Sequence, residues 1–115
     1  MTARTLQPEH IAESQNPSAS MDNLAKLVVS LAHLCGVNAW HVKGHDDAPR
    51  LAPATYFAVF ATESAVWIDR RYADGYDTRS LDREKTFALL QQLLVATSRI
   101  IDRKARVEEL LTGLA

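Results

Sequence analysis

The chain has 115 residues, 47% of them hydrophobic and 23% charged, which is typical of one globular domain rather than of a disordered or collagen-like chain. Its 13 basic and 14 acidic residues give a net charge of -1, which provides no long-range field to attract nucleic acid or an anionic membrane. The single Cys35 excludes an internal disulfide, and no segment approaches the roughly 20 apolar residues of a membrane span, so we expect a cytoplasmic protein.

The N-terminal part of the chain divides into an arm and a helix. Residues 1–19 are predicted to form a flexible polar arm, because they offer too little apolar surface to offset the entropy lost on ordering. Residues 20–115 then form a single domain. Its first helix is predicted to begin after Ser20, a favourable capping residue, and to end at Gly36. Apolar residues recur between them at helical spacing, at Leu24, Leu27, Val28, Leu31, Leu34 and Cys35.

Cys35 is predicted to be a core residue of this helix. It lies within the apolar stripe, whereas His33 lies about 160° away around the helix axis. The alternative is a nucleophile, with Cys35 paired to His41 of the next segment. A thiol in apolar surroundings has a raised pKa and reacts poorly, so the core role is the better interpretation.

The segment after Gly36 carries the most suggestive chemistry. Residues 37–43 are predicted to form a short strand, and residues 44–53 have the composition of a loop. Across this junction lie His41, His45, Asp46 and Asp47. Imidazole and carboxylate groups bind divalent metals and accept protons, so these four residues form a candidate metal site or acid–base site. A solvated loop is the simpler interpretation, because Gly44 disfavours the helix that would place both histidines on one face.

A β-hairpin is predicted from residues 56–61 and 65–70, which are rich in aromatic and β-branched residues. Both faces of its strands are apolar, so either the other helix, the N-terminal arm or another molecule must cover the second face. The aromatic residues between Trp40 and Phe87 either pack in the core or form a stacking platform, and core packing is the simpler explanation. Residues 70–79 are predicted to be a polar loop. Asp74 and Asp77 of this loop, together with Asp69, flank a glycine as in a calcium-binding loop, but their spacing does not match that of its ligands.

A long amphipathic helix is predicted from about residue 81 to 112. Its length would be near 48 Å at about 1.5 Å per residue, so we expect it to bend or split, most naturally at residues 102–106. The apolar residues beyond this point are candidates for contact with a partner: Val107, Leu110, Leu111 and Leu114. Arg99, Arg103 and Arg106 form a basic strip, for which a solvated helix face is favoured over phosphate binding.

These patterns predict an α+β fold with an N-terminal helix, a small antiparallel sheet of about three strands and a long C-terminal helix that is bent or split. The expected function is that of a bacterial interaction or adaptor protein without catalysis and without a cofactor. It would self-associate as a homodimer, or bind a partner protein, through the sheet face and the C-terminal helix. The alternative is a metal-dependent or histidine-based enzyme that uses residues 41–47. Nucleic-acid binding through the three arginines is a weaker hypothesis.

Overall fold

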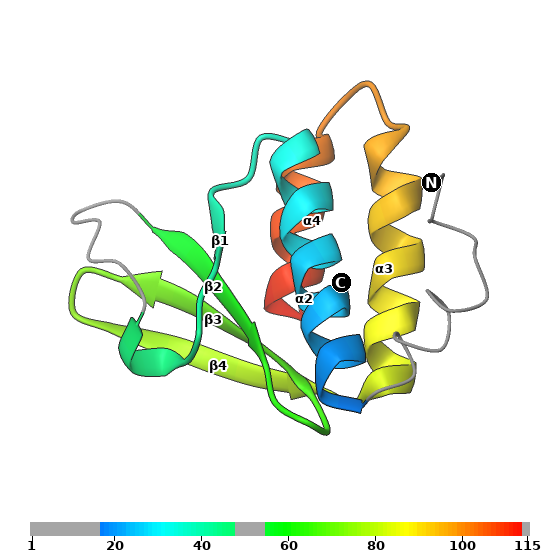
Figure 1. Cartoon of the computed structure of the whole chain (residues 1–115). Coiled ribbons are helices and arrows are strands. Elements are labelled where there is room, and N and C mark those ends of the chain that lie inside the picture. Colours follow the sequence, from blue (N-terminus) through cyan, green and yellow to red (C-terminus); the bar gives the residue numbers. More distant parts are fainter. Residues whose placement is uncertain (1–16, 48–54, 114–115) are drawn as a thin grey trace, which may run out of the picture.

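The computed structural model describes residues 17–47 and 55–113. These residues form three α-helices and a four-stranded sheet in two layers, which confirms the predicted α+β class. In chain order the elements are α2 (Pro17–Leu34), β1 (Ala39–His41), the short 3-10 helix η1 (His45–Asp47), β2 (Tyr56–Ala61), β3 (Val66–Tyr72), β4 (Gly75–Leu81), α3 (Arg83–Thr97) and α4 (Arg103–Thr112). All three helices lie on one side of the sheet (Figure 1).

The sheet has the order β1-β2-β3-β4 and contains one strand more than predicted. β1 runs parallel to β2, and the other neighbours are antiparallel, so the sheet is mixed. The predicted hairpin is confirmed as β2 and β3. The prediction of a polar loop over residues 70–79 is wrong, because β4 pairs with β3 from Val66↔Leu81 to Tyr72↔Gly75. β4 is an edge strand with mostly exposed side chains, so its polar composition is compatible with pairing.

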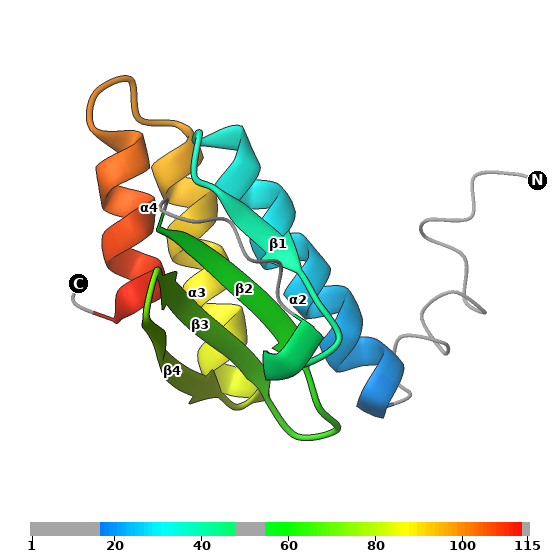
Figure 2. The same ribbon diagram turned by 90° about the vertical axis from the view of Figure 1, so that its left-hand side faces the viewer.

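Both faces of β2 are buried, as the sequence predicts. Phe57 and Val59 belong to the main core, which the three helices share with the sheet. Tyr56, Ala58 and Phe60 point to the opposite face and form a second, smaller cluster with Val42, against which Trp67 packs. Figure 2 shows this outer face of the sheet with the helices behind it. The sheet is therefore covered by helices on one face and carries the second cluster on the other.

The first helix begins earlier than predicted. α2 starts at Pro17, so Ser20 lies inside the helix instead of capping it. Proline suits a helix start, because the first turn does not use the N–H group that proline lacks. Of the predicted arm, residues 17–19 thus belong to α2, and residues 1–16 lie outside the described part of the chain. The predicted end is confirmed, since Gly36 follows the helix with a left-handed φ of 80°, and Cys35 is buried in the core.

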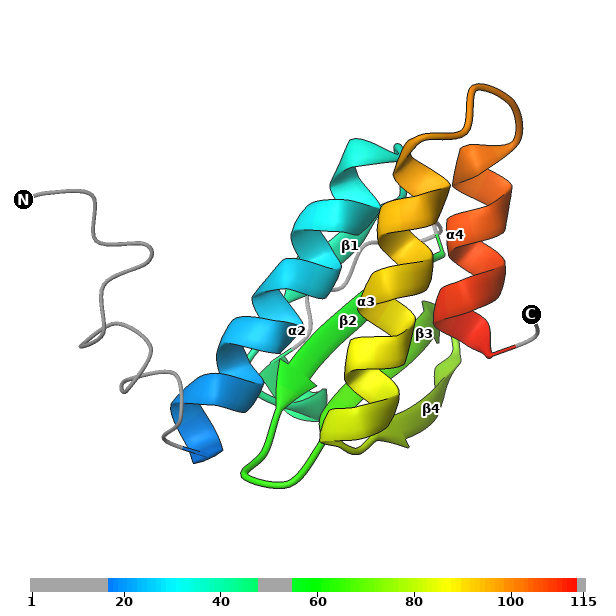
Figure 3. The same ribbon diagram turned by 90° about the vertical axis from the view of Figure 1, so that its right-hand side faces the viewer.

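The C-terminal segment is split into two helices, and the break lies at residues 98–102 rather than at 102–106. Asp102 takes a left-handed conformation with φ 63°, which aspartate tolerates better than most residues. α4 then runs back beside α3 in the opposite direction (Figure 3). Among the described helices, none combines the length and the apolar character that crossing a membrane requires.

Candidate functional site

The four residues of the predicted metal site do not converge. The His41 Nε2 atom lies 2.7 Å from Asp22 Oδ1 on α2. His45 instead contacts Asp69 on the outer face of the sheet, and Asp46 and Asp47 are exposed in η1. Within residues 17–47 and 55–113, no group of three or more His, Cys, Asp or Glu side chains is arranged to hold a metal ion. The geometry therefore gives no support to the metal hypothesis.

The contact of His41 predicts a pH-dependent contribution to stability. Burial alone would raise the pKa of Asp22, but hydrogen bonds from His41 and Lys26 outweigh burial and hold this pKa below its ordinary value. A carboxyl whose folded pKa is lowered stabilises the fold above its unfolded pKa, and this stabilisation is lost as pH falls through the folded pKa. Asp22→Asn should thus lower the free energy of unfolding by at most about 1 kcal/mol at neutral pH. In urea titrations the difference in free energy of unfolding between Asp22→Asn and the wild type should shrink below about pH 4. A difference that does not change with pH would contradict a stabilising role for the ionised Asp22 carboxylate.

A buried carboxylate, Asp69, lies at the centre of the outer sheet face. It occupies the middle of β3 between Ala58 and Thr78 of the neighbouring strands, and its side chain is fully buried. The His45 Nδ1 atom lies 2.7 Å from Asp69 Oδ2, and Arg71 Nη1 lies 3.5 Å from the same oxygen. The other oxygen, Oδ1, has no hydrogen-bond partner. This buried charge depends on two cationic or proton-donating neighbours.

Aromatic rings hold His45 in place above Asp69. The imidazole stacks on the Tyr76 ring at 5.2 Å and meets the Phe60 ring edge-on at 4.7 Å. The Arg71 guanidinium lies over the same Tyr76 ring, 4.4 Å from the ring centre. Such a carboxylate–histidine pair fixes the ring and leaves Nε2 as a proton acceptor when Nδ1 donates. The Cys35–His41 alternative is not formed, because His41 contacts Asp22 and Cys35 is buried among the apolar side chains of the main core. We interpret the His45–Asp69 pair as the attachment of η1 to the sheet.

The aromatic residues do not form one stacking platform. Three of the aromatic residues between Trp40 and Phe87 are buried in the main core or in the outer-face cluster, namely Tyr56, Phe57 and Phe60. Those with substantial exposure lie on different elements, at Trp40, Tyr72, Tyr76 and Phe87. Core packing thus explains the first group, and the second group is scattered over both layers.

The apolar residues predicted to contact a partner lie in the core. Val107, Leu110 and Leu111 are buried between α4, α3 and the sheet. Leu114 lies outside the described residues. Since α4 folds back on the domain, its apolar face is covered within the chain. The projecting helix end, on which the predicted partner contact depended, is not formed.

The predicted basic strip is divided between a loop and a helix. Arg99 lies in the connection between α3 and α4, and only Arg103 and Arg106 belong to α4. Arg103 donates to the carbonyl of Thr97 at 3.3 Å, and Arg106 lies 3.6 Å from Glu109. These arginines therefore serve the helix connection and the helix surface, which fits the interpretation of a solvated face.

An exposed apolar surface lies instead on the outer side of α2. Asp22 and His33 bond to residues of β1, so their side of the helix faces β1. Leu27 and Leu34 lie roughly 120° away from these residues, on the side toward α3, against which α2 packs. They are 50% and 63% exposed. Large apolar side chains with this exposure on a helix face are a candidate contact surface.

Two residues of α3 extend this surface across the seam between the helices. Lys85 and Gln92 line a hollow together with residues of α4, so their side of α3 faces α4. Phe87 and Leu94 lie about 160° away, on the side toward α2, and are 45% and 57% exposed. Figure 3 shows α3 between α2 and α4, which agrees with this assignment. We call Leu27, Leu34, Phe87 and Leu94 the α2–α3 strip.

The far end of the helix layer adds further exposed apolar side chains. Val95 lies in the last turns of α3, and Ile100 and Ile101 lie in the connection to α4. α2 and α3 run in the same direction (Figure 1), so these residues lie at the same end of the layer as Leu34.

Comparisons of the chain with protein-family models, with curated proteins and with solved structures find no match. The candidate sites therefore depend on the geometry of this chain alone.

Proposed function

We propose that this protein is an interaction module that forms a homodimer through the α2–α3 strip. One observation carries the proposal: Leu27, Leu34, Phe87 and Leu94 are between 45% and 63% exposed along a single seam of the helix layer. Each fully buried side chain of this kind contributes about 1.5–3 kcal/mol, so covering the exposed halves of four of them is a substantial gain. This gain supports association.

A second copy is the partner that fits this surface most simply. The strip consists of apolar side chains on two neighbouring helices that run in parallel. A two-fold axis perpendicular to the helices would place the strip of one copy against the same strip of the other, and two-fold homodimers are the commonest oligomers. Four helices would then form a bundle-like layer between two outer sheets.

The strip differs from the interface expected from the sequence. The sequence predicts a contact through the sheet face and the end of the C-terminal helix, whereas the proposed contact uses α2 and α3. The proposal keeps the expected role of a module without chemistry of its own. It also keeps the expected setting in a bacterial cytoplasm, where a single cysteine such as Cys35 stays reduced.

Sedimentation or light scattering across micromolar to millimolar concentrations tests the proposal. The wild-type mass should rise with concentration from 12.8 kDa toward twice this value. The double variant Leu34→Glu/Leu94→Glu should remain monomeric, because four buried charges would face one another in the dimer. Circular dichroism should stay unchanged, since both side chains are exposed in the monomer.

Ala88→Glu is the matched control for this experiment. It adds the same charge to an exposed position on α3 that lies on the side toward α4, so it should dimerise as the wild type does. A wild-type protein that stays monomeric up to millimolar concentration would refute the dimer. A dimer that tolerates Leu34→Glu/Leu94→Glu would show that another surface is used.

A further inference from the structure

The connection between α3 and α4, residues 98–102, carries the most exposed apolar side chains of the described residues. It projects beyond the ends of α2 and α3 at one end of the helix layer (Figure 1). Ile100 is 96% exposed and Ile101 is 70% exposed, and Val95 at the end of α3 is 69% exposed. Apolar side chains gathered in this way at one end of the molecule form a candidate contact surface.

Hydrogen bonds hold the connection in a defined shape. The Arg99 Nε atom donates to the carbonyl of Ile101 at 3.5 Å, and the Arg103 Nη1 atom donates to the carbonyl of Thr97 at 3.3 Å. Asp102 then leads into α4 from a left-handed conformation. The two isoleucines are therefore presented by an ordered backbone, so a contact through them costs less conformational entropy than one through a flexible segment.

Basic side chains surround the two isoleucines. Arg99, Arg103 and Lys104 are exposed, and none of them forms an ion pair within residues 17–47 and 55–113. Among residues 98–104, Asp102 is the only acidic residue. Three basic residues and one acidic residue give this segment a net charge of +2.

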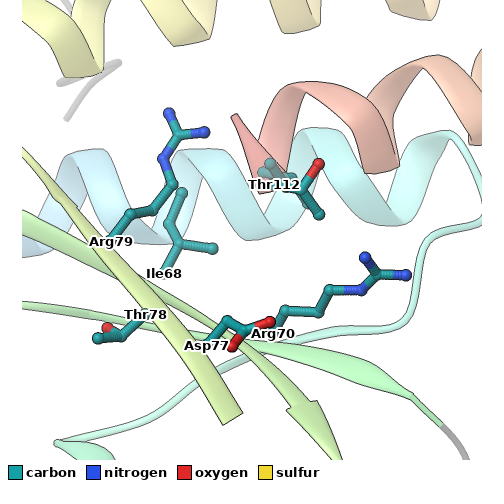
Figure 4. A pocket seen from close by; sticks show the side chains of 7 residues that line it. Ile68, Arg70, Asp77, Thr78, Arg79 and Thr112 are labelled. Carbon is teal, nitrogen blue, oxygen red and sulfur yellow. The ribbon is translucent and has the colours of Figure 1, made fainter. Parts of the chain in front are cut away.

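Two other arginines lie beside carboxylates instead. Arg70 stands directly opposite Asp77 in the β3–β4 ladder (Figure 4), and Arg106 lies 3.6 Å from Glu109. The whole chain carries a net charge of -1, so it has no long-range attraction for an anionic surface. The positive charge of residues 98–104 is local, and at physiological salt it acts within about 8 Å.

A lipid bilayer fits this surface better than a folded protein does. A stable protein interface buries about 800 Å² on each partner, which a projecting connection of five residues does not supply. A bilayer instead accepts a convex apolar tip, and its anionic headgroups attract basic side chains beside the tip. The cytoplasmic leaflet of a cell membrane carries such lipids.

We propose that the α3–α4 connection binds the surface of an anionic lipid bilayer. Its two isoleucines insert between the headgroups, and the three basic side chains lie beside the lipid phosphates. The contact is peripheral and reversible, because its apolar area is smaller than that of a covalent lipid anchor. The connection lies outside the α2–α3 strip, so this binding goes beyond the proposed homodimer and does not depend on it.

Co-sedimentation of the full chain with lipid vesicles tests this contact. Phosphatidylcholine vesicles with about one-third phosphatidylglycerol should bind the protein at about millimolar lipid. Vesicles of phosphatidylcholine alone should bind it at least about tenfold more weakly, because they offer no net charge to the basic side chains. Binding to the anionic vesicles should weaken at about 1 M salt, which screens this attraction.

Substitutions separate the apolar part of the contact from the charged part. Ile100→Ser/Ile101→Ser should lower the vesicle partition coefficient at least about tenfold, because less apolar area leaves water, whereas Ile100→Leu/Ile101→Leu should bind as the wild type does. Lys104→Glu should also weaken binding about tenfold. Lys43→Glu is its matched control, because it makes the same charge change at an exposed position before η1, far from the connection (Figure 1).

Several results would overturn the bilayer contact. An absence of binding up to about 10 mM lipid, or equal binding to both kinds of vesicle, would refute an anionic bilayer as the partner. Unchanged binding of Ile100→Ser/Ile101→Ser would place the contact on another surface. Binding to soluble polyglutamate that Lys104→Glu abolishes, without any binding to vesicles, would assign the connection to an acidic protein instead.

The serine variant should keep the melting temperature of the wild type, since both isoleucines are exposed. If it folds poorly, amide NMR of the wild type with anionic bicelles decides. The resonances of residues 99–104 should shift or broaden as the bicelles are added. Changes confined to other residues would refute the contact.

Discussion

Replacing Leu111 with alanine is expected to lower the free energy of unfolding by about 2–5 kcal/mol. The Leu111 side chain is fully buried in the main core, where α4 packs on α3 and the sheet. Alanine removes its transfer energy and leaves a cavity, because the surrounding side chains relax only partly. Urea unfolding followed by circular dichroism measures the loss.

The matched control for this prediction is Leu94→Ala. Leu94 is 57% exposed on α3, so at about 1 µM, where a weak dimer dissociates, alanine should change the free energy of unfolding by only about 0.5 kcal/mol. The effects on self-association should be the reverse. Leu94→Ala should weaken self-association, whereas Leu111→Ala should leave it unchanged while the protein is folded. If Leu111→Ala instead weakened association without affecting unfolding, α4 would be an interface, as the sequence alone predicts.

The contrast between these two leucines shows what helical periodicity can and cannot predict. The apolar spacing over residues 20–36 correctly predicts a helix that ends at Gly36 with Cys35 inside. The centre of the buried face, however, lies toward Ala25 and Ala32, which are fully buried. Small side chains allow close packing but contribute little to a pattern of large apolar residues. The stripe of leucines therefore predicts a core face that is too wide, because its edge at Leu27 and Leu34 is exposed in the structure.

The helix break and the fourth strand could not be predicted for a different reason. The connection at residues 98–102 contains neither proline nor glycine. Side-chain hydroxyls help to end α3, because Thr97 and Ser98 donate to the carbonyls of Leu94 and Val95, and this competition with the helix is weak as a sequence signal. β4 shows no alternation since it is an exposed edge, so only its pairing with β3 identifies it as a strand.

The outer-face cluster depends on contacts that are distant in sequence. The pattern around residues 41–47 predicts a metal or acid–base site that includes His45, whereas in the structure His45 contacts Asp69, which lies 24 residues further along the chain. Asp69 is a charged residue within an apolar strand, and this departure from the pattern was the one available signal. A carboxylate buried on a central strand requires partners, which the sequence could not name.

The dependence of Asp69 on its partners leads to an asymmetric prediction. His45→Ala should lower the free energy of unfolding by about 3 kcal/mol, because it leaves a buried carboxylate with Arg71 as its remaining partner. Asp69→Val removes the buried charge itself and should cost less than His45→Ala, since His45 and Arg71 are 33% and 19% exposed and can turn to water. Valine also suits a central strand.

The double variant His45→Ala/Asp69→Val separates the charge from the packing of the ring. Once the carboxylate is absent, removing His45 should cost only the packing of the imidazole against Tyr76 and Phe60, about 1 kcal/mol. The double-mutant cycle should thus give a coupling energy of about 2 kcal/mol between the two residues. Urea unfolding of the four proteins at neutral pH measures it. A cost of His45→Ala that is the same with and without Asp69 would mean that ring packing alone attaches η1 to the sheet, because the buried charge would then need no partner.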